Sequence, residues 1–238
     1  TYLLTASKIE EKTSFEFTTE KIYRVYLSRI LKWRENSNFN VETEPADKTL
    51  YIIGESHSLV SHHLRVNHLR QNFFGIAKLV KGCMQYHLGN PVRNEYKCQF
   101  ERVFYSLPKL SNVLLAIGEI DCRIDLGIIE HKKKYPHKTI KNIIVTTIDN
   151  YLSYVLNINS SCQHNITIQG VPCSNIDTDK YAEKDVKQLI EVITVFNGEL
   201  KAKSKASGLG FLDLHKLTNK GDGLSNSIWH LDKYHILL

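Results

Sequence analysis

The chain has 238 residues, of which 42% are hydrophobic, enough to fill the core of one large domain or of a domain with an appendage. No apolar run approaches the roughly 20 residues needed to cross a bilayer, and the first residues lack the basic-then-apolar order of a signal peptide, so neither a membrane span nor export is expected. The net charge is +6, but no RNP sequence or zinc-finger pair accompanies it, so we do not expect a nucleic-acid partner.

The first 45 residues are predicted to form a helical extension. TTEKIYRVYLSRILKW follows a cap at Thr18 or Thr19, and one stripe of this helix carries Ile22, Tyr26, Ile30 and Trp33. The polar segment NSNFNVETEPADK then connects the extension to a main domain over residues 46–238. Because the chain does not begin with Met, we leave open that it belongs to a larger multidomain protein.

The main domain alternates short apolar runs with longer helical patterns. The runs predict buried strands at Leu50–Ile53, Val113–Ile117, Ile166–Ile168 and Gly210–Leu212. The helices are predicted at about Leu59–Phe73, Glu95–Leu107, Lys138–Leu156 and Asp179–Ala202. This order favours an α/β fold with a parallel sheet and right-handed crossovers.

Ligands bind at the carboxyl ends of the strands in such sheets. The loops at those ends read GESHS, GEIDCR, QGVPCSN and DLHKL. Candidate functional residues should therefore come from these four loops.

Two further features bear on partners and location. The basic run HKKKYPHK, residues 131–138, is interpreted as a solvated loop or helix end, with contact to a phosphate or an anionic glycan as the alternative. The five cysteines form no CxxC pair, so we expect reduced thiols in a cytoplasmic protein, with neither a disulfide framework nor a zinc site.

A nucleophile is suggested by Ser56, which follows the first predicted strand. A serine needs a base to take its proton and a third group to orient that base. The tail WHLDKYHILL supplies His235 with Asp232 three residues before it. The alternatives are that Ser56 only caps a helix and that His235 is a surface histidine on a frayed tail.

Other groups could replace parts of this arrangement. His230 is a rival base, although no carboxylate precedes it at the same short spacing, and Asp222 is an alternative loop carboxylate. The G-x-S-x-G elbow of α/β-hydrolases is absent, because Ser58 stands where its second glycine belongs.

The sequence resembles the SGNH, or GDSL-like, hydrolases, in a divergent bacterial subgroup with GESHS and GEIDCR blocks. Gly54 to Ser56 correspond to the family's GDS-type motif, and Asp232 to His235 correspond to its D-x-x-H, within a resemblance that covers about residues 48–238. The resemblance implies a flavodoxin-like three-layer α/β fold, with the N-terminal helical segment packed against it. It also implies a catalytic triad of Ser56, His235 and Asp232 that uses no cofactor or metal.

The same resemblance implies an oxyanion hole. Its donors would be the backbone N–H groups of Ser56 and of Gly82, with Gly89 as the fallback. The family's third block is usually G-x-N-D, but Ile120 stands at the asparagine position and cannot donate a hydrogen bond. Arg123 is the best-placed substitute. Loss of one such donor can cost on the order of 10²- to 10³-fold in rate.

Four more residues are expected to contact substrate: Glu55, His57, Glu119 and Asp121. Each has an alternative. Asp121 could hydrogen-bond the nucleophile loop, Arg123 could form an ion pair with Glu55 or Glu119, and His57 could line the pocket or face solvent. Glu119 and Asp121 could also act as a glycosidase carboxylate pair, which only their closeness in sequence supports.

No metal is expected, because the neighbouring histidines lack the i, i+3 or i, i+4 spacing of helical ligand pairs. These histidines are His57, His62, His63 and His68.

The sequence therefore predicts a serine esterase that hydrolyses an acyl ester, on a carbohydrate or a related metabolite. The alternatives are an O-acyltransferase acting on a glycan and a non-catalytic glycan-binding or interaction domain of the same fold.

Overall fold

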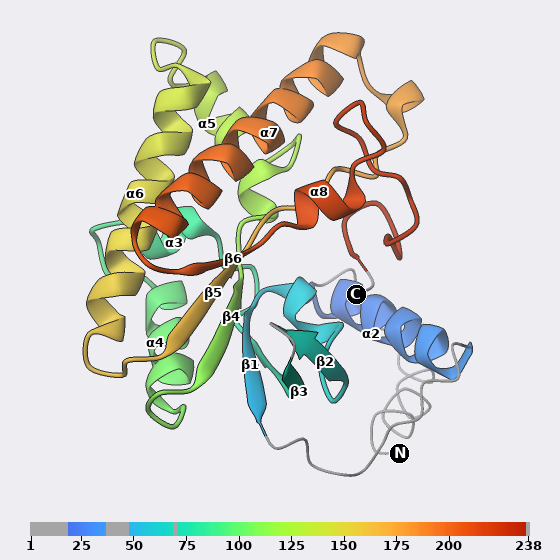
Figure 1. Ribbon diagram of the computed structural model, residues 1–238. Helices are drawn as coiled ribbons and strands as arrows, with labels where there is room; N and C mark the ends of the chain where they lie inside the picture. Colours follow the sequence, from blue (N-terminus) through green and yellow to red (C-terminus); the bar gives the residue numbers. More distant parts are fainter. Residues whose placement is uncertain (1–18, 37–47, 69–70, 237–238) are drawn as a thin grey trace. The chain divides into compact units, whose positions relative to one another are not determined.

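The computed structural model describes residues 19–36, 48–68 and 71–236 (Figure 1). The chain divides into two compact units, residues 1–43 and 44–238. The described part of the first unit is helix α2 (Thr19–Asn36), which lies where the sequence predicts a helix. The cap at Thr18 and the domain boundary at residue 45 lie outside the described residues. The packing of the extension on the main domain stays a prediction.

The second unit is built on a sheet with strand order β2-β3-β1-β4-β5-β6. Its strands are β1 (Thr49–Gly54), β2 (Arg65–His68), β3 (Gln71–Leu79), β4 (Asn112–Ala116), β5 (Asn165–Gln169) and β6 (Gly210–Leu212). Only β2 is antiparallel to its neighbour. Counted in chain order, the five parallel strands lie 2-1-3-4-5 across the sheet, which is the flavodoxin-like order. The predicted fold class is confirmed.

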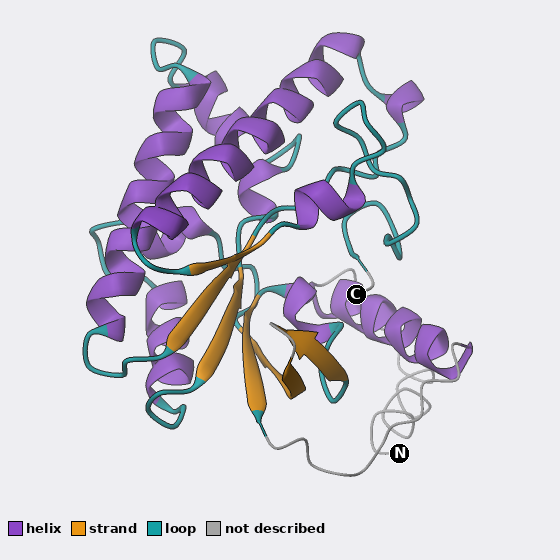
Figure 2. Cartoon of the chain, in the orientation of Figure 1, coloured by secondary structure: helices purple, strands orange, loops and turns teal. Residues whose placement is uncertain are grey.

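Helices flank this sheet and connect its strands (Figure 2). They are α3 (Gln85–Gly89), α4 (Glu95–Tyr105), α5 (Gly127–Lys134), α6 (Ile140–Asn159), α7 (Glu183–Ala206) and α8 (Leu214–Thr218). Three short 3-10 helices lie in the loops, η1 (Ser56–Leu59), η2 (Ile120–Cys122) and η3 (Thr178–Lys180). The predicted helices at 95–107, 138–156 and 179–202 correspond to α4, α6 and α7. None of the described helices is long and apolar enough to span a membrane.

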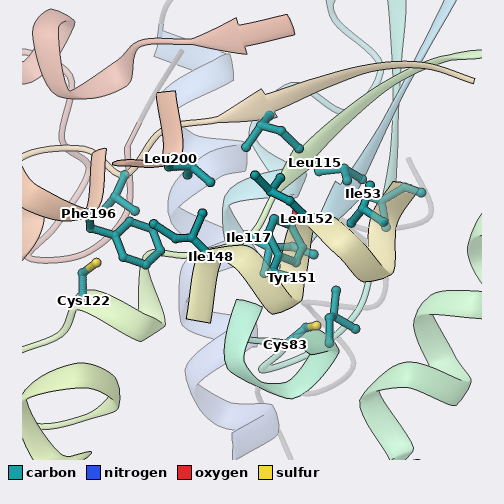
Figure 3. Close-up of a cluster of buried hydrophobic side chains, with 14 of the residues drawn as sticks. Ile53, Cys83, Leu115, Ile117, Cys122, Ile148, Tyr151, Leu152, Phe196 and Leu200 are labelled. Carbon is teal, nitrogen blue, oxygen red and sulfur yellow. The ribbon is translucent and has the colours of Figure 1, made fainter. Parts of the chain in front are cut away.

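The core is divided between the two faces of the sheet because successive side chains on a strand point to opposite sides. Ile53 joins the larger cluster with residues of β4, β5, α4, α6 and α7, and Figure 3 shows part of it around Leu115, Tyr151 and Phe196. The neighbouring Ile52 joins a smaller cluster on the other face. Parallel strands buried on both faces explain the continuous apolar runs in the sequence.

The helix predicted over Leu59–Phe73 is wrong. After η1 the chain turns at His63, which has a positive φ of 58°, and forms the β2–β3 hairpin. β3 pairs in parallel with β1 from Phe74 to Leu79, and Phe73 and Gly75 are buried as alternate residues of the strand. The sheet partner therefore overrides a local helical pattern.

The basic run forms the last turn of α5 and the loop after it. Lys132 Nζ donates hydrogen bonds to the carbonyl oxygens of Pro136 and Lys138, at 2.7 and 2.8 Å. The run therefore lies at a helix end, as one interpretation of the sequence predicted. The five cysteines carry free thiols, as expected.

Candidate active site

The predicted site residues gather where the strand order reverses, at the adjacent strands β1 and β4. In doubly wound sheets this switch point is where ligands bind, beyond the carboxyl ends of the strands. Gly54 ends β1 so close to β4 that an added Cβ would lie 2.1 Å from the Ala116 carbonyl oxygen. This close approach requires glycine and places the next residues, Glu55 and Ser56, at the edge of the sheet.

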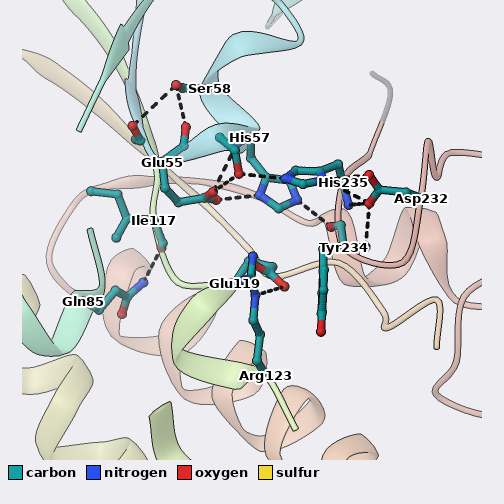
Figure 4. Close-up of polar contacts among 12 residues, drawn as sticks. Glu55, His57, Ser58, Gln85, Ile117, Glu119, Arg123, Asp232, Tyr234 and His235 are labelled. Carbon is teal, nitrogen blue, oxygen red and sulfur yellow. Dashed lines mark hydrogen bonds and ion pairs between the residues drawn. The ribbon is translucent and has the colours of Figure 1, made fainter. Parts of the chain in front are cut away.

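Ser56, His235 and Asp232 lie together although Ser56 and His235 are 179 positions apart in sequence. Figure 4 shows His235 beside Asp232. Ser56 Oγ is 3.0 Å from His235 Nε2. His235 Nδ1 is 2.9 and 3.0 Å from the two carboxylate oxygens of Asp232. Ser56 and His235 are only 6% and 8% exposed. These distances are those of a nucleophile, a base and an orienting carboxylate.

The tail can hold this geometry because Asp232 also closes its own turn. One carboxylate oxygen, Oδ1, accepts the backbone N–H groups of Tyr234 and His235, both at 2.9 Å. Burial would raise the pKa of Asp232, but these hydrogen bonds and the interaction with His235 outweigh it and lower the pKa. An ionised carboxylate only accepts, so Nδ1 of His235 carries a proton toward Asp232, and this orientation directs Nε2 at Ser56 Oγ.

Next to Ser56, Glu55 and His57 form a buried pair. Glu55 Oε1 is 2.5 Å from His57 Nδ1, and Glu55 Oε2 accepts the Ser56 hydroxyl at 2.5 Å. The other ring nitrogen of His57, Nε2, is 2.9 Å from the backbone carbonyl oxygen of Tyr234. Glu55 and His57 are 1% and 4% exposed, so the solvent-facing imidazole considered from the sequence is wrong.

The two members of this pair stabilise each other's charged form. Burial would lower the pKa of His57. The negative charge of Glu55 and the hydrogen bond to it outweigh burial and raise this pKa to about 9. Burial would raise the pKa of Glu55, but the charge and hydrogen bond of His57 outweigh it and lower that pKa to about 2. At neutral pH the pair is therefore a carboxylate and an imidazolium.

Arg123 forms the ion pair with Glu119 that was considered as an alternative to an oxyanion role. Its Nε lies 2.9 and 3.0 Å from the Glu119 oxygens, and its Nη2 lies 2.6 Å from one of them. The guanidinium carbon also sits 4.3 Å from the centre of the Tyr234 ring. Its described hydrogen bonds thus go to Glu119, and donation by Arg123 to an oxyanion stays a prediction.

Asp121 does not bond the nucleophile loop through its described hydrogen bonds. Its carboxylate accepts the backbone N–H groups of Gln85 and Tyr86, at 2.8 and 3.1 Å, and so caps the start of α3. Burial raises its pKa to about 7, against the lowering effect of these two N–H groups. With Glu119 bound to Arg123 and Asp121 facing α3, the two do not act as a facing carboxylate pair.

Gly82 and Gly89, the two glycines considered as oxyanion donors, have different surroundings. Gly89 lies at the contact of α3 with α6, where an added Cβ would be 2.9 Å from Asn150 Cβ and from Tyr151 N. Gly82 follows β3 with a φ of +67°, and an added Cβ would meet only Tyr96, at 3.8 Å. Helix packing therefore explains Gly89, which favours Gly82 as the loop glycine. Ile120 begins η2 and brings no polar group to it.

The rivals considered for the triad are engaged elsewhere. His230 Nδ1 is 2.7 Å from Ser225 Oγ, and burial followed by the charge of His57 lowers its pKa to about 4. Asp222 is half-exposed and pairs with Lys220 at 3.2 Å. Neither contacts Ser56 through a described hydrogen bond.

Glu55, His57 and Glu119 have ligand atoms within 4.8 Å of one another, the spacing of a metal site. The partners of His57 disfavour that role. A carbonyl oxygen can only accept, so Nε2 bears a proton toward Tyr234, and Nδ1 faces an ionised carboxylate. An imidazole with both nitrogens protonated has no lone pair for a metal, and the cluster fits a charge pair.

A separate cavity of about 850 Å³ lies between α3, α5 and α6. Its lining includes Tyr86, Asp121 and Lys134 but no member of the predicted triad. Residues of the basic run reach it, so contact of that run with an anionic glycan stays a prediction.

Sequence reasoning missed two groups of the site. The Tyr234 carbonyl belongs to the backbone, so no residue type could have signalled it. Gln85 is fully buried and donates from Nε2 to the Ile117 carbonyl oxygen at 2.8 Å. Its sequence signal was weak, because α3 is only five residues long and was not predicted.

Comparison with known proteins supports the fold. No protein-family model and no curated protein matches the chain. Among solved structures, a GDSL-like lipase from Bacteroides thetaiotaomicron is similar with a TM-score of 0.51 and 14% identity, over 90% of this chain and 88% of that one. A protein from Streptococcus pneumonia gives a TM-score of 0.51 and 12% identity, over 88% and 84%. The chain therefore has the SGNH, or GDSL-like, hydrolase fold that its motifs predicted.

Proposed function

We propose that the protein is a serine esterase that hydrolyses an acyl ester. One observation carries the proposal: Ser56 Oγ lies 3.0 Å from His235 Nε2, while Asp232 holds the opposite nitrogen of the same ring. A serine that only capped a helix would need no such base. The GDSL-like lipase with the same fold is consistent with ester chemistry.

The reaction runs through an acyl-enzyme. Ser56 Oγ attacks the ester carbonyl carbon while His235 Nε2 takes the hydroxyl proton, and Asp232 stabilises the imidazolium that forms. The tetrahedral intermediate collapses as His235 returns the proton to the leaving alkoxide, which departs as an alcohol. A water molecule then attacks the acyl-enzyme by the same steps, releasing the acid and restoring Ser56.

The negative oxygen of the intermediate needs hydrogen-bond donors. We assign this role to the backbone N–H groups of Ser56 and Gly82, which the family resemblance implies. Ile120 leaves the usual third donor without a side-chain counterpart. A rate below that of a full oxyanion hole follows from this assignment.

We assign the substrate to the acyl esters of carbohydrates or related metabolites. A pocket that shares Glu119, Arg123 and Tyr234 with the site also contains Lys233 and apolar residues such as Ile124 and Val171. The charged groups of this pocket offer hydrogen-bond partners for a hydroxyl-rich alcohol.

The test is hydrolysis of acetylated sugars by three proteins: the wild type, Ser56→Ala and Ser58→Ala. Ser58 is the matched control because it lies in the same 3-10 helix, fully buried, with its hydroxyl bonded to the Glu55 carbonyl oxygen at 2.7 Å. We expect Ser56→Ala to lose at least about 10³-fold in kcat and Ser58→Ala to stay within about tenfold of wild type. Equal rates for wild type and Ser56→Ala would refute the esterase.

A glycan-binding domain without catalysis is the second candidate, favoured by the cavity between α3, α5 and α6. Its lining mixes the exposed ring of Tyr86 with amide and charged side chains, as glycan sites do. Saturable binding of an unmodified glycan, unchanged in Ser56→Ala and without turnover of any ester, would favour this candidate. If the acyl group instead appears on an added sugar and not on water, the protein is an O-acyltransferase.

A further inference from the structure

His57 is fixed at both ring nitrogens, in a place where the proposed reaction gives it no chemical step. We propose that His57 is a positioning residue: its doubly protonated ring holds the His235-bearing turn over Ser56 and neutralises Glu55 next to the nucleophile. This inference rests on the proposed esterase function and adds a residue that its mechanism does not name.

The protonation state follows from the partners of the ring. Nε2 faces the Tyr234 carbonyl oxygen at 2.9 Å, and that oxygen can only accept a hydrogen bond. Nδ1 faces the Glu55 carboxylate at 2.5 Å. Both side chains are almost fully buried, where a lone charge would be very unfavourable and a hydrogen-bonded pair is tolerated. His57 is therefore an imidazolium that donates at both ends.

The bond to Tyr234 determines where His235 stands. Ser56 is hydrogen-bonded to His235, and His57 is hydrogen-bonded to the Tyr234 carbonyl oxygen. Two neighbouring hydrogen bonds therefore join η1 to the C-terminal turn. The rings of His57 and His235 are 5.6 Å apart between centroids. The Tyr234 carbonyl belongs to the peptide bond that joins Tyr234 to His235. Loss of its hydrogen bond to His57 therefore lets the His235 ring move away from Ser56. A displacement of about 1 Å can cost on the order of 10²-fold in rate.

The bond to Glu55 bears on the proton of Ser56. The hydroxyl can point to Glu55 Oε2, 2.5 Å away, or to His235 Nε2, 3.0 Å away. The charge of His57 makes Glu55 a weak base, with a pKa of about 2, so the proton goes to His235 during attack. Without that charge, Glu55 would be an uncompensated anion beside the developing oxyanion, or would take up a proton itself.

The neighbours of His57 support a permanent charge. The titratable and charged groups that bear on the ring or face it are Glu55, Glu119, Arg123, His230 and His235. Two carboxylates face two fixed cations in this group, so His57 and Arg123 balance Glu55 and Glu119. Loss of the His57 proton would leave the cluster with a net negative charge at the site of an anionic transition state.

Kinetics of four variants test the positioning role: His57→Gln, Glu55→Gln, the double variant, and His137→Gln as a control on the exposed basic loop. We expect His57→Gln to lower kcat by about 10²-fold with KM nearly unchanged. The double variant removes both charges and should recover at least about tenfold over His57→Gln. His137→Gln should match wild type. If kcat loss merely tracks the folded fraction, or the double variant is no faster than His57→Gln, the positioning role is wrong.

A second readout does not depend on catalysis. In a histidine-specific ¹⁵N NMR titration of the inactive Ser56→Ala protein, we expect His57 to stay doubly protonated past pH 8. Adding Glu55→Gln should move its titration midpoint below pH 7. A neutral His57 at pH 7 in Ser56→Ala would overturn the inference even if the esterase is real. A charged His57 in a wild-type protein that hydrolyses no ester would instead locate the failure in the proposed function.

Discussion

Asp232 combines two tasks in one carboxylate, and a single substitution separates them. Its Oδ1 accepts two backbone N–H groups, which an asparagine oxygen could also do. Asparagine cannot, however, stabilise an imidazolium by charge, and its NH₂ group would favour the wrong tautomer of His235. The turn and the chemistry should therefore respond differently.

We expect Asp232→Asn to lower kcat by about 10³- to 10⁴-fold while the thermal midpoint changes little. Steady-state kinetics and circular dichroism melting measure the two effects. A kcat within tenfold of wild type would show that Asp232 does not serve the base.

Arg123 offers a choice between an ion pair and an oxyanion donor. Both partners are largely buried, with side chains 19% exposed for Arg123 and 11% for Glu119. Arg123→Gln leaves Glu119 unpaired and should destabilise the fold by roughly 2 to 3 kcal/mol. Adding Glu119→Gln should restore most of that loss.

Urea unfolding measures these differences, and kcat is compared at matched folded fraction. If Arg123 serves only the ion pair, the double variant keeps the wild-type kcat. A fall of 10²-fold or more in kcat in the refolded double variant would instead assign Arg123 to the oxyanion.

At this scale the sequence identified residue types but not their partners. Ser56, Asp232 and His235 could be proposed from the sequence because their chemistry is specific and their spacing matches a known pattern. Glu55 and His57 were expected to contact substrate, yet they bond to each other and to the Tyr234 carbonyl. The Tyr234 carbonyl is a backbone group far along the chain, so the sequence around His57 gives no signal of it.

Helix α3 follows the Gly82 loop and is bonded to the loop that carries Asp121. Its start is capped by Asp121 of η2, and its end packs on α6 through Gly89. Gly89→Ala places a methyl group against Asn150 and the backbone of Tyr151, so it should cost about 1 to 3 kcal/mol of stability. Because Gly89 serves packing, kcat per folded molecule should not change.

Chemical denaturation and active-site titration measure the two quantities. Gly82→Ala is the comparison, because its strain comes from a positive φ rather than from a contact. If fully folded Gly89→Ala has a lower kcat than wild type, then Gly89 is the oxyanion donor.

The secondary structure was predicted best where helices and strands are long or buried. In the main domain, the four predicted strands and three of the four predicted helices are present, since continuous apolar runs and long amphipathic patterns are strong signals. The β2–β3 hairpin was missed because its segment pairs with β1, a partner outside any local window. The short helices α3, α5 and α8 have too few turns to give a period.

Across the whole molecule, the 2-1-3-4-5 strand order brings distant segments to one site. The loop after β1 supplies Glu55 to His57, and the C-terminal turn supplies His235, the proposed base. The buried Glu55–His57 pair then links active-site charge to global stability. Because the folded-state pKa of His57 is raised to about 9, the pair stabilises fully below the ordinary histidine value of about 6.5.

This stability should be lost as pH rises through about 9. Between pH 7 and 10, we expect the free energy of unfolding to fall more in wild type than in the double variant Glu55→Gln/His57→Gln. The difference between the two falls should be at most about 3 kcal/mol. Urea titrations at a series of pH values measure the difference. Parallel profiles for the two proteins would show that His57 is not charged in the folded state.

The central claim is that Ser56 is a nucleophile activated by His235. Its most direct test is peptide mass spectrometry after reaction with a fluorophosphonate, applied to wild type, Ser56→Ala and His235→Gln. The account predicts one phosphonyl group on the peptide that contains Ser56 in wild type, none in Ser56→Ala, and labelling at least about 10³-fold slower in His235→Gln. Labelling of another residue, or labelling of Ser56 at an undiminished rate without His235, would contradict it.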